Sequence, residues 1–79
     1  MELQVGHYYV DRQGIVWCVT SVSGQRLWPV SYSRWDNGKF IGKVCHADGT
    51  TFVVGHEREE PDDLIREATV EEVRALSAW

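Results

Sequence analysis

Aromatic and basic side chains gather near the middle of the sequence, and their types suit binding rather than catalysis. Trp28, Tyr32, Arg34 and Trp35 lie in or beside a polar segment. Large aromatic rings together with arginine are typical of the energetic centres of protein interfaces. The same rings can stack on single-stranded bases, or form a cage for methylated lysine. The sequence therefore predicts a contact surface at these four residues, unless Trp28 and Tyr32 line the core and only Trp35 is exposed.

The distribution of charge along the chain indicates which kind of ligand this surface favours. Residues 1–56 carry four acidic and five basic side chains, a balance of +1, whereas residues 57–79 carry eight acidic and three basic ones, a balance of −5. An acidic tail repels nucleic acid, whose binding needs a basic face, but it speeds association with a basic protein. A protein partner is therefore expected first, and single-stranded nucleic acid along Arg26, Arg34, Lys39 and Lys43 is the alternative. The expected electrostatic rim, otherwise a plain solvated surface, is formed by Glu59, Glu60, Asp62 and Asp63.

Catalytic and metal-binding patterns are missing from the sequence. It contains no Gly-x-Gly-x-x-Gly, Walker or His-Glu-x-x-His arrangement. An exposed acidic run does not separate the pKa values of two carboxyl groups, as acid–base catalysis requires. Cys18 and Cys45 lie far apart, and the adjacent residues Cys45 and His46 would point to opposite faces of a strand. We therefore expect no enzyme, no catalytic residue, no metal and no cofactor.

Short β-branched and aromatic segments alternate with glycine-bearing turns, which indicates an antiparallel β protein. Asn37-Gly38 is a strong hairpin signal, and Ser33–Gly38 is expected to be a polar loop. Because Pro29 has no amide to donate to a neighbouring strand, its segment is expected to form an edge strand or to contain a bulge. The strands predicted in this way are Val5–Val10, Ile15–Val22, Arg26–Tyr32, Phe40–Cys45, Thr51–Val54 and Leu64–Ala68.

A helix is predicted at the C-terminus over residues 69–78. Thr69-Val70-Glu71-Glu72 has the form of a capping box. Val70, Val73 and Leu76 form an apolar stripe, which we expect to dock on the sheet because so short a helix is unstable alone. The fold expected for residues 1–79 is a single domain, a small SH3-like barrel of five or six strands with this helix, since closure removes exposed edges.

The chain is expected to be cytoplasmic and free of the membrane. No apolar run approaches the roughly 18 residues that span a bilayer, and Met-Glu-Leu-Gln-Val does not resemble a signal peptide. Two cysteines are too few for a disulfide framework. The proline-bearing segment Arg26–Tyr32 is compatible with either a monomer or a homodimer.

Three turn motifs resemble those of small accessory proteins encoded by tailed phages and prophages. The motifs are Gly6-x-Tyr8-Tyr9-Val10-x-Arg12-x-Gly14, His46-Ala47-Asp48-Gly49 and Glu60-Pro61-x-Asp63-Leu64-Ile65. The group typically has Asp, Arg and Ser where this chain has Gln13, Thr50 and Glu60. The resemblance implies a product made in a bacterial cytoplasm that binds a host protein, inhibiting a defence system, as anti-CRISPR proteins do, or host transcription.

Overall fold

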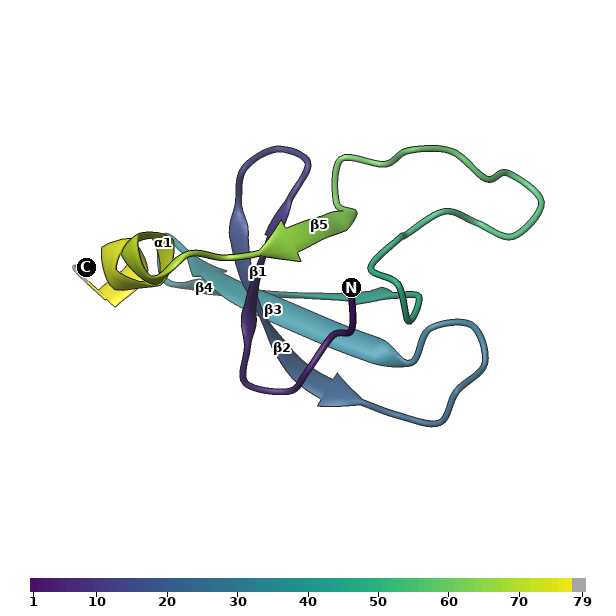
Figure 1. Cartoon of the computed structure of the whole chain (residues 1–79), viewed down its shortest axis with the longest axis horizontal. Helices are drawn as coiled ribbons and strands as arrows, with labels where there is room; N and C mark the ends of the chain where they lie inside the picture. The colour runs from purple at the N-terminus through teal and green to yellow at the C-terminus, as the bar shows by residue number, and fades with distance from the viewer. Residues whose placement is uncertain (78–79) are drawn as a thin grey trace.

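The computed structural model describes residues 1–77, which form one antiparallel sheet and a short helix (Figure 1). The sheet order is β4-β3-β2-β1-β5. This confirms the mainly β class with a C-terminal helix. The elements are β1 (Tyr8–Asp11), β2 (Val16–Val22), β3 (Val30–Asp36), β4 (Lys39–Cys45), β5 (Leu64–Glu67) and α1 (Val70–Ser77).

The sheet is open, so the closed SH3-like barrel expected from the sequence is not shown. Within residues 1–77, β4 and β5 form the two edges and do not pair with each other. The long loop 46–63 connects them and extends from the end of the molecule opposite α1 (Figure 1). The first part of this loop lies beside the start of β5, where the amide of Leu64 donates to the carbonyl of Gly49 at 2.8 Å.

The third strand lies later in the chain than predicted. β3 spans Val30–Asp36 and thus includes the segment 33–36 that was expected to be a loop. Asn37 and Gly38 both have positive φ, 50° and 76°, and form a two-residue turn that pairs Asp36 with Lys39. Because the turn has only two residues, β3 and β4 pair up to the residues that directly flank it, and β3 is longer than predicted. Pro29 precedes the strand, where its missing amide costs no ladder bond.

Other boundaries also differ from the sequence prediction. The first strand begins at Tyr8 rather than Val5, after a turn at Gly6, whose φ is 82°. Thr51–Val54 is not a strand, since only an isolated bridge joins Val53 to His56. The prediction of a last strand from Leu64 is confirmed, although β5 ends at Glu67.

The hydrophobic core lies on one face of the sheet. Trp17 and Tyr32 pack edge to face, with ring centroids 4.9 Å apart. Val19 and Cys45 are fully buried beside them, and Leu3 belongs to the same cluster. Trp17, in the middle of β2, is therefore a core residue.

A buried carboxylate, Asp11, fastens the turn between β1 and β2 to this core. Its Oδ1 accepts hydrogen bonds from the amides of Gln13 and Ile15, both at 2.9 Å. Its Oδ2 accepts one from Nε1 of Trp17, also at 2.9 Å. Asp11 thereby compensates two turn amides and the only polar atom of the buried indole, as burial of polar groups requires.

A second buried carboxylate, Asp63, joins three segments at the start of β5. Its Oδ1 accepts hydrogen bonds from the amide and the hydroxyl of Thr51, both at 2.8 Å. Its Oδ2 accepts from the amide of Glu60 at 3.0 Å and from Nε of Arg12 at 3.1 Å. Burial by itself would raise the pKa of Asp63, but these donors together hold that pKa below its usual 3.8.

The helix is capped as predicted but does not dock as predicted. The amide of Thr69 donates to Glu72 at 2.8 Å, and the amide of Glu72 donates to the Thr69 hydroxyl at 3.2 Å. Arg66 makes two bonds to Glu72, at 2.8 and 2.9 Å, and chiefly this contact lowers the pKa of Glu72 to about 2. Val70 is nonetheless 61% exposed and Leu76 is also exposed. The clamp holds α1 beyond the end of the sheet (Figure 1), so the expected docking of its apolar stripe is wrong. The predicted helix end at Ala78, like Trp79, lies outside the described residues.

We predict that Asp63→Asn lowers the free energy of unfolding by about 3 kcal/mol at neutral pH, because an amide donor then faces the donors of Glu60 and Arg12. The lowered pKa of Asp63 means that its contribution is complete above pH 3.8 and is lost as the pH falls through the folded-state value. Urea unfolding should therefore show the difference between wild type and variant shrinking below pH 3.8. Glu71→Gln, at an exposed helix position, is the control, and an equal loss in both variants would contradict the prediction.

Candidate functional site

An aromatic pair stands exposed on the β3–β4 hairpin. Trp35 and Phe40 face each other across the two strands, with ring centroids 5.6 Å apart in an edge-to-face arrangement. Trp35 is 71% exposed and Phe40 is 61% exposed. The two-residue turn at Asn37-Gly38 positions the pair, because it makes these residues direct cross-strand neighbours.

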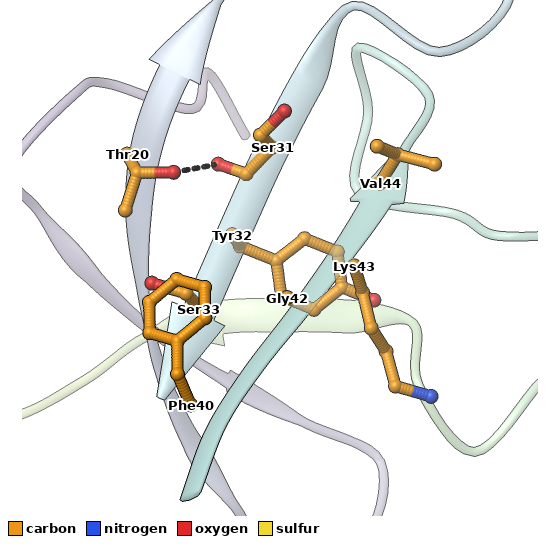
Figure 2. A pocket seen from close by; sticks show the side chains of 8 residues that line it. All are labelled: Thr20, Ser31, Tyr32, Ser33, Phe40, Gly42, Lys43 and Val44. Carbon is orange, nitrogen blue, oxygen red and sulfur yellow. Dashed lines mark hydrogen bonds between the residues drawn. The ribbon is translucent and has the colours of Figure 1, made fainter. Parts of the chain in front are cut away.

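A shallow hollow of about 350 Å³ lies beside Phe40 on the same face (Figure 2). Gly42 opens it, because this glycine presents no side chain between Phe40 and Val44. The Phe40 ring leans toward the gap and would lie 3.4 Å from a Cβ atom added to Gly42. We name this surface the hairpin face and define it by Thr20, Ser31, Ser33, Trp35, Phe40, Gly42 and Val44.

The four aromatic and basic residues predicted to form one surface are divided between two faces. Trp35 lies on the hairpin face, but Tyr32 and Arg34 point to the core face, since side chains alternate along β3. Tyr32 is 1% exposed, and its hydroxyl donates to the carbonyl of Asp62 at 3.0 Å. Burial, above all, raises the pKa of this phenol. Tyr32 is therefore a core residue and not a surface contact.

Arg34 and Trp28 have structural contacts of their own. The Arg34 guanidinium lies over the Trp17 ring at 5.1 Å and reaches Asp36 at 3.8 Å. Trp28 is half-buried and stacks on His46, with ring centroids 4.2 Å apart. Neither residue joins Trp35, so the expected cluster is reduced to one of its four members.

The expected acidic rim is largely neutralised by neighbouring basic groups. Asp63 is buried and bonded to Arg12, as described above. Asp62 pairs with Lys43 at 2.6 Å, and Glu60 pairs with Arg58 at 2.5 Å. Glu59 remains the most exposed of the four, 3.7 Å from Arg12. Asp62 therefore holds the 46–63 loop to β4 and Asp63 holds it to the β1–β2 turn, while Glu60 pairs within the loop, so the four do not form one continuous acidic surface.

Phe40, Gly42 and Val44 are the site residues that the sequence prediction missed. Their signal was present, since they alternate with Lys39 and Lys43 in a predicted strand. Pairing with β3 through the Asn37-Gly38 turn was needed to place them beside Trp35.

His46 forms a second aromatic cluster, with Trp28 and Phe52. Its ring lies 4.4 Å from the Phe52 ring. Its Nδ1 faces the carbonyl of Leu27 at 2.5 Å, and its Nε2 faces the carbonyl of Phe52 at 2.8 Å. Both ring nitrogens are thus directed at backbone acceptors, which makes this histidine a link between the β2–β3 loop and the 46–63 loop.

Cys45 is buried next to this histidine. Burial, followed by the charges of Asp48 and Asp63, raises the pKa of the Cys45 thiol to about 12. The thiol is therefore protonated at neutral pH, whereas a metal ligand or nucleophile needs the thiolate. Within residues 1–77, no three His, Cys, Asp or Glu side chains come together as a metal site would require.

Comparison with protein-family models, curated proteins and solved structures finds no match to this chain. Among the described residues, no helix has the length and apolar character needed to cross a membrane.

We predict that Tyr32→Phe, in the core, lowers the free energy of unfolding more than Trp35→Ser, on the hairpin face. Tyr32→Phe removes the hydroxyl that bonds to the Asp62 carbonyl, so the free energy of unfolding should fall by about 1 kcal/mol. Trp35→Ser removes an exposed ring, and the free energy of unfolding should change by less than about 0.5 kcal/mol. Urea unfolding followed by circular dichroism measures both values. The reverse order of effects would contradict the assignment of the two faces.

Proposed function

We propose that this chain is a non-enzymatic binding protein that engages another protein through its hairpin face. The observation that carries the proposal is the exposed pair of Trp35 and Phe40, which lie in contact on a hairpin closed by a two-residue turn. Tryptophan is among the residues that dominate binding energy at interfaces. A preformed aromatic pair also loses little conformational freedom on binding.

The chemistry of the hollow supports binding rather than catalysis. The polar side chains that it presents on the hairpin face are the hydroxyls of Thr20, Ser31 and Ser33. The Thr20 hydroxyl donates to the backbone carbonyl of Ser31 at 3.3 Å (Figure 2). Lys43 extends to Asp62, so no base is positioned to activate a hydroxyl. The hollow is suited to receive an apolar side chain of a partner, with the hydroxyls bonding to its backbone.

The resemblance to phage and prophage accessory proteins supplies the proposed partner, which is a protein of the bacterial host. Host takeover through inhibition of a defence system or of transcription is the role that we propose for the complex, in the bacterial cytoplasm. The net charge of −4 favours a basic partner surface. The sheet order, a meander of β1 to β4 with β5 beside β1, also supports the SH3-like character that we propose for the fold.

Single-stranded nucleic acid is less well supported as the ligand. Of the basic residues that would follow its phosphates, Arg34 contacts Asp36 and Lys43 contacts Asp62. Both side chains also point to the core face, away from Trp35. Bases stacked on the aromatic pair would therefore have no contact with Arg34 or Lys43, two of the four cationic groups expected beside them.

The test compares the immobilised wild type with two double variants in bacterial lysate. W35S/F40T removes the aromatic pair, whereas V53S/V54S removes two similarly exposed side chains from the 46–63 loop and serves as the control. We expect one protein to be retained by the wild type and the control, with at least about tenfold weaker binding to W35S/F40T. Equal retention by all three would contradict the proposal. Loss of the retained material after nuclease treatment would instead favour the nucleic-acid alternative.

A further inference from the structure

Strand β4 is a seven-residue edge strand that no element of the described chain covers by pairing. It pairs with β3 on one side, and residues 1–77 contribute no strand to its other side. An edge of this length presents unpaired amides and carbonyls and is a template for a further strand. Such an edge can therefore pair with a strand of another molecule.

The hairpin register shows which backbone groups are free. The two-residue turn makes Asp36 and Lys39 a hydrogen-bonded pair, and such pairs then recur at every second residue. Ile41 and Lys43 therefore direct their backbone groups toward β3. The amides and carbonyls of Phe40, Gly42 and Val44 point outward, away from β3. Within residues 1–77, none of them makes a backbone hydrogen bond to a turn or loop.

We propose that the occupant is β4 of a second copy of this chain, paired antiparallel about a two-fold axis at Gly42. Gly42 then faces the partner's Gly42, and Phe40 faces the partner's Val44. Because all of these residues direct their backbone groups outward, each pair exchanges both of its hydrogen bonds. The interface is isologous, as a two-fold dimer requires.

The lysines select this register from its neighbours. With Gly42 at the axis, Lys43 lies opposite the partner's Ile41 and Lys39 lies opposite the partner's Cys45. A shift of two residues in one direction places Lys39 opposite the partner's Lys43. A shift in the other direction places Lys43 opposite the partner's Lys43. Like charges directly opposite each other destabilise a sheet, so only the Gly42-centred register pairs the whole strand without such repulsion.

Side chains near the axis also favour pairing. Lys43 carries a charge that can guard an edge, but its side chain projects to the core face, where its Nζ lies 2.6 Å from Asp62, and it leaves the outward backbone groups of β4 uncovered. Phe40 and Val44, both exposed in the single chain, would lie beside their counterparts across the axis and lose apolar surface to water. Trp35 lies on β3, away from the axis, so dimerisation leaves it free and does not depend on the proposed function.

The first test replaces Gly42 and measures mass by sedimentation velocity from about 5 to 500 µM. The wild type is expected to approach twice its monomer mass of 9.1 kDa. Gly42→Pro removes the outward amide at the axis and should sediment at the monomer mass, since an edge strand tolerates proline where the amide points away from its neighbour. Gly42→Ala keeps the amide and should remain dimeric. A monomeric wild type across this range, or a dimeric Gly42→Pro variant, would overturn the proposal.

A charge exchange at two exposed positions provides a test that does not depend on proline. In F40K/V44K, introduced lysines oppose one another across the interface, and the dimer should dissociate. In F40K/V44E, each introduced lysine opposes a glutamate of the partner, and the dimer should re-form. Circular dichroism confirms that both variants are folded. Equal masses for the two variants would exclude the Gly42-centred register. Trp35→Ser lies off the edge and should leave the dimer mass unchanged, so loss of partner binding in that variant tests the proposed function separately from dimerisation.

Discussion

The hydrogen bonds of the buried Asp63 carboxylate are the constraint on which the rest of the structure depends. They join the β1–β2 turn, through Arg12, to Thr51 in the long loop and to Glu60 just before β5. A loop that leaves the sheet edge for so many residues would lose more conformational entropy than its few apolar contacts repay. The carboxylate replaces those contacts with directional bonds. Gly49 adds to them, because a Cβ atom there would lie only 2.5 Å from the carbonyl oxygen of Leu64.

The stabilising ion pairs and the exposed aromatic residues are therefore found in different parts of the fold. The acidic groups of the 46–63 loop are used internally, against Arg12, Lys43 and Arg58. The β3–β4 hairpin needs few such contacts, since its turn and its cross-strand pairs hold it in shape. The outer face of this hairpin can therefore carry exposed aromatic residues without endangering the core beneath it. Trp35 and Phe40 occupy that face, while Tyr32 on the opposite side of the same strands holds the core together.

Strand β4 combines two kinds of surface. Its side chains at Phe40 and Val44 contribute to the hairpin face, and its outward backbone groups form an open edge. The two surfaces are perpendicular, because side chains project above the sheet whereas hydrogen bonds lie within it. One strand can therefore contact a second copy through its edge and a different protein through its face. Gly42 belongs to both, since it opens the hollow and its outward backbone groups lie at the middle of the edge.

The sequence alone determined the features that depend on near neighbours in the chain. These include the mainly β class, the Asn37-Gly38 turn, the Thr69 capping box and the strand predicted over Ile15–Val22. Tertiary structure alone decided the burial of Asp63, the inward direction of Tyr32 and the position of α1 beyond the sheet. Each of these depends on partners far away in the sequence, and the same composition permits several such pairings. The division of the predicted aromatic cluster shows the difference most directly. A shift in the boundaries of one strand turned an expected loop into a pleated segment, whose alternation sent Tyr32 into the core and left Trp35 in solvent.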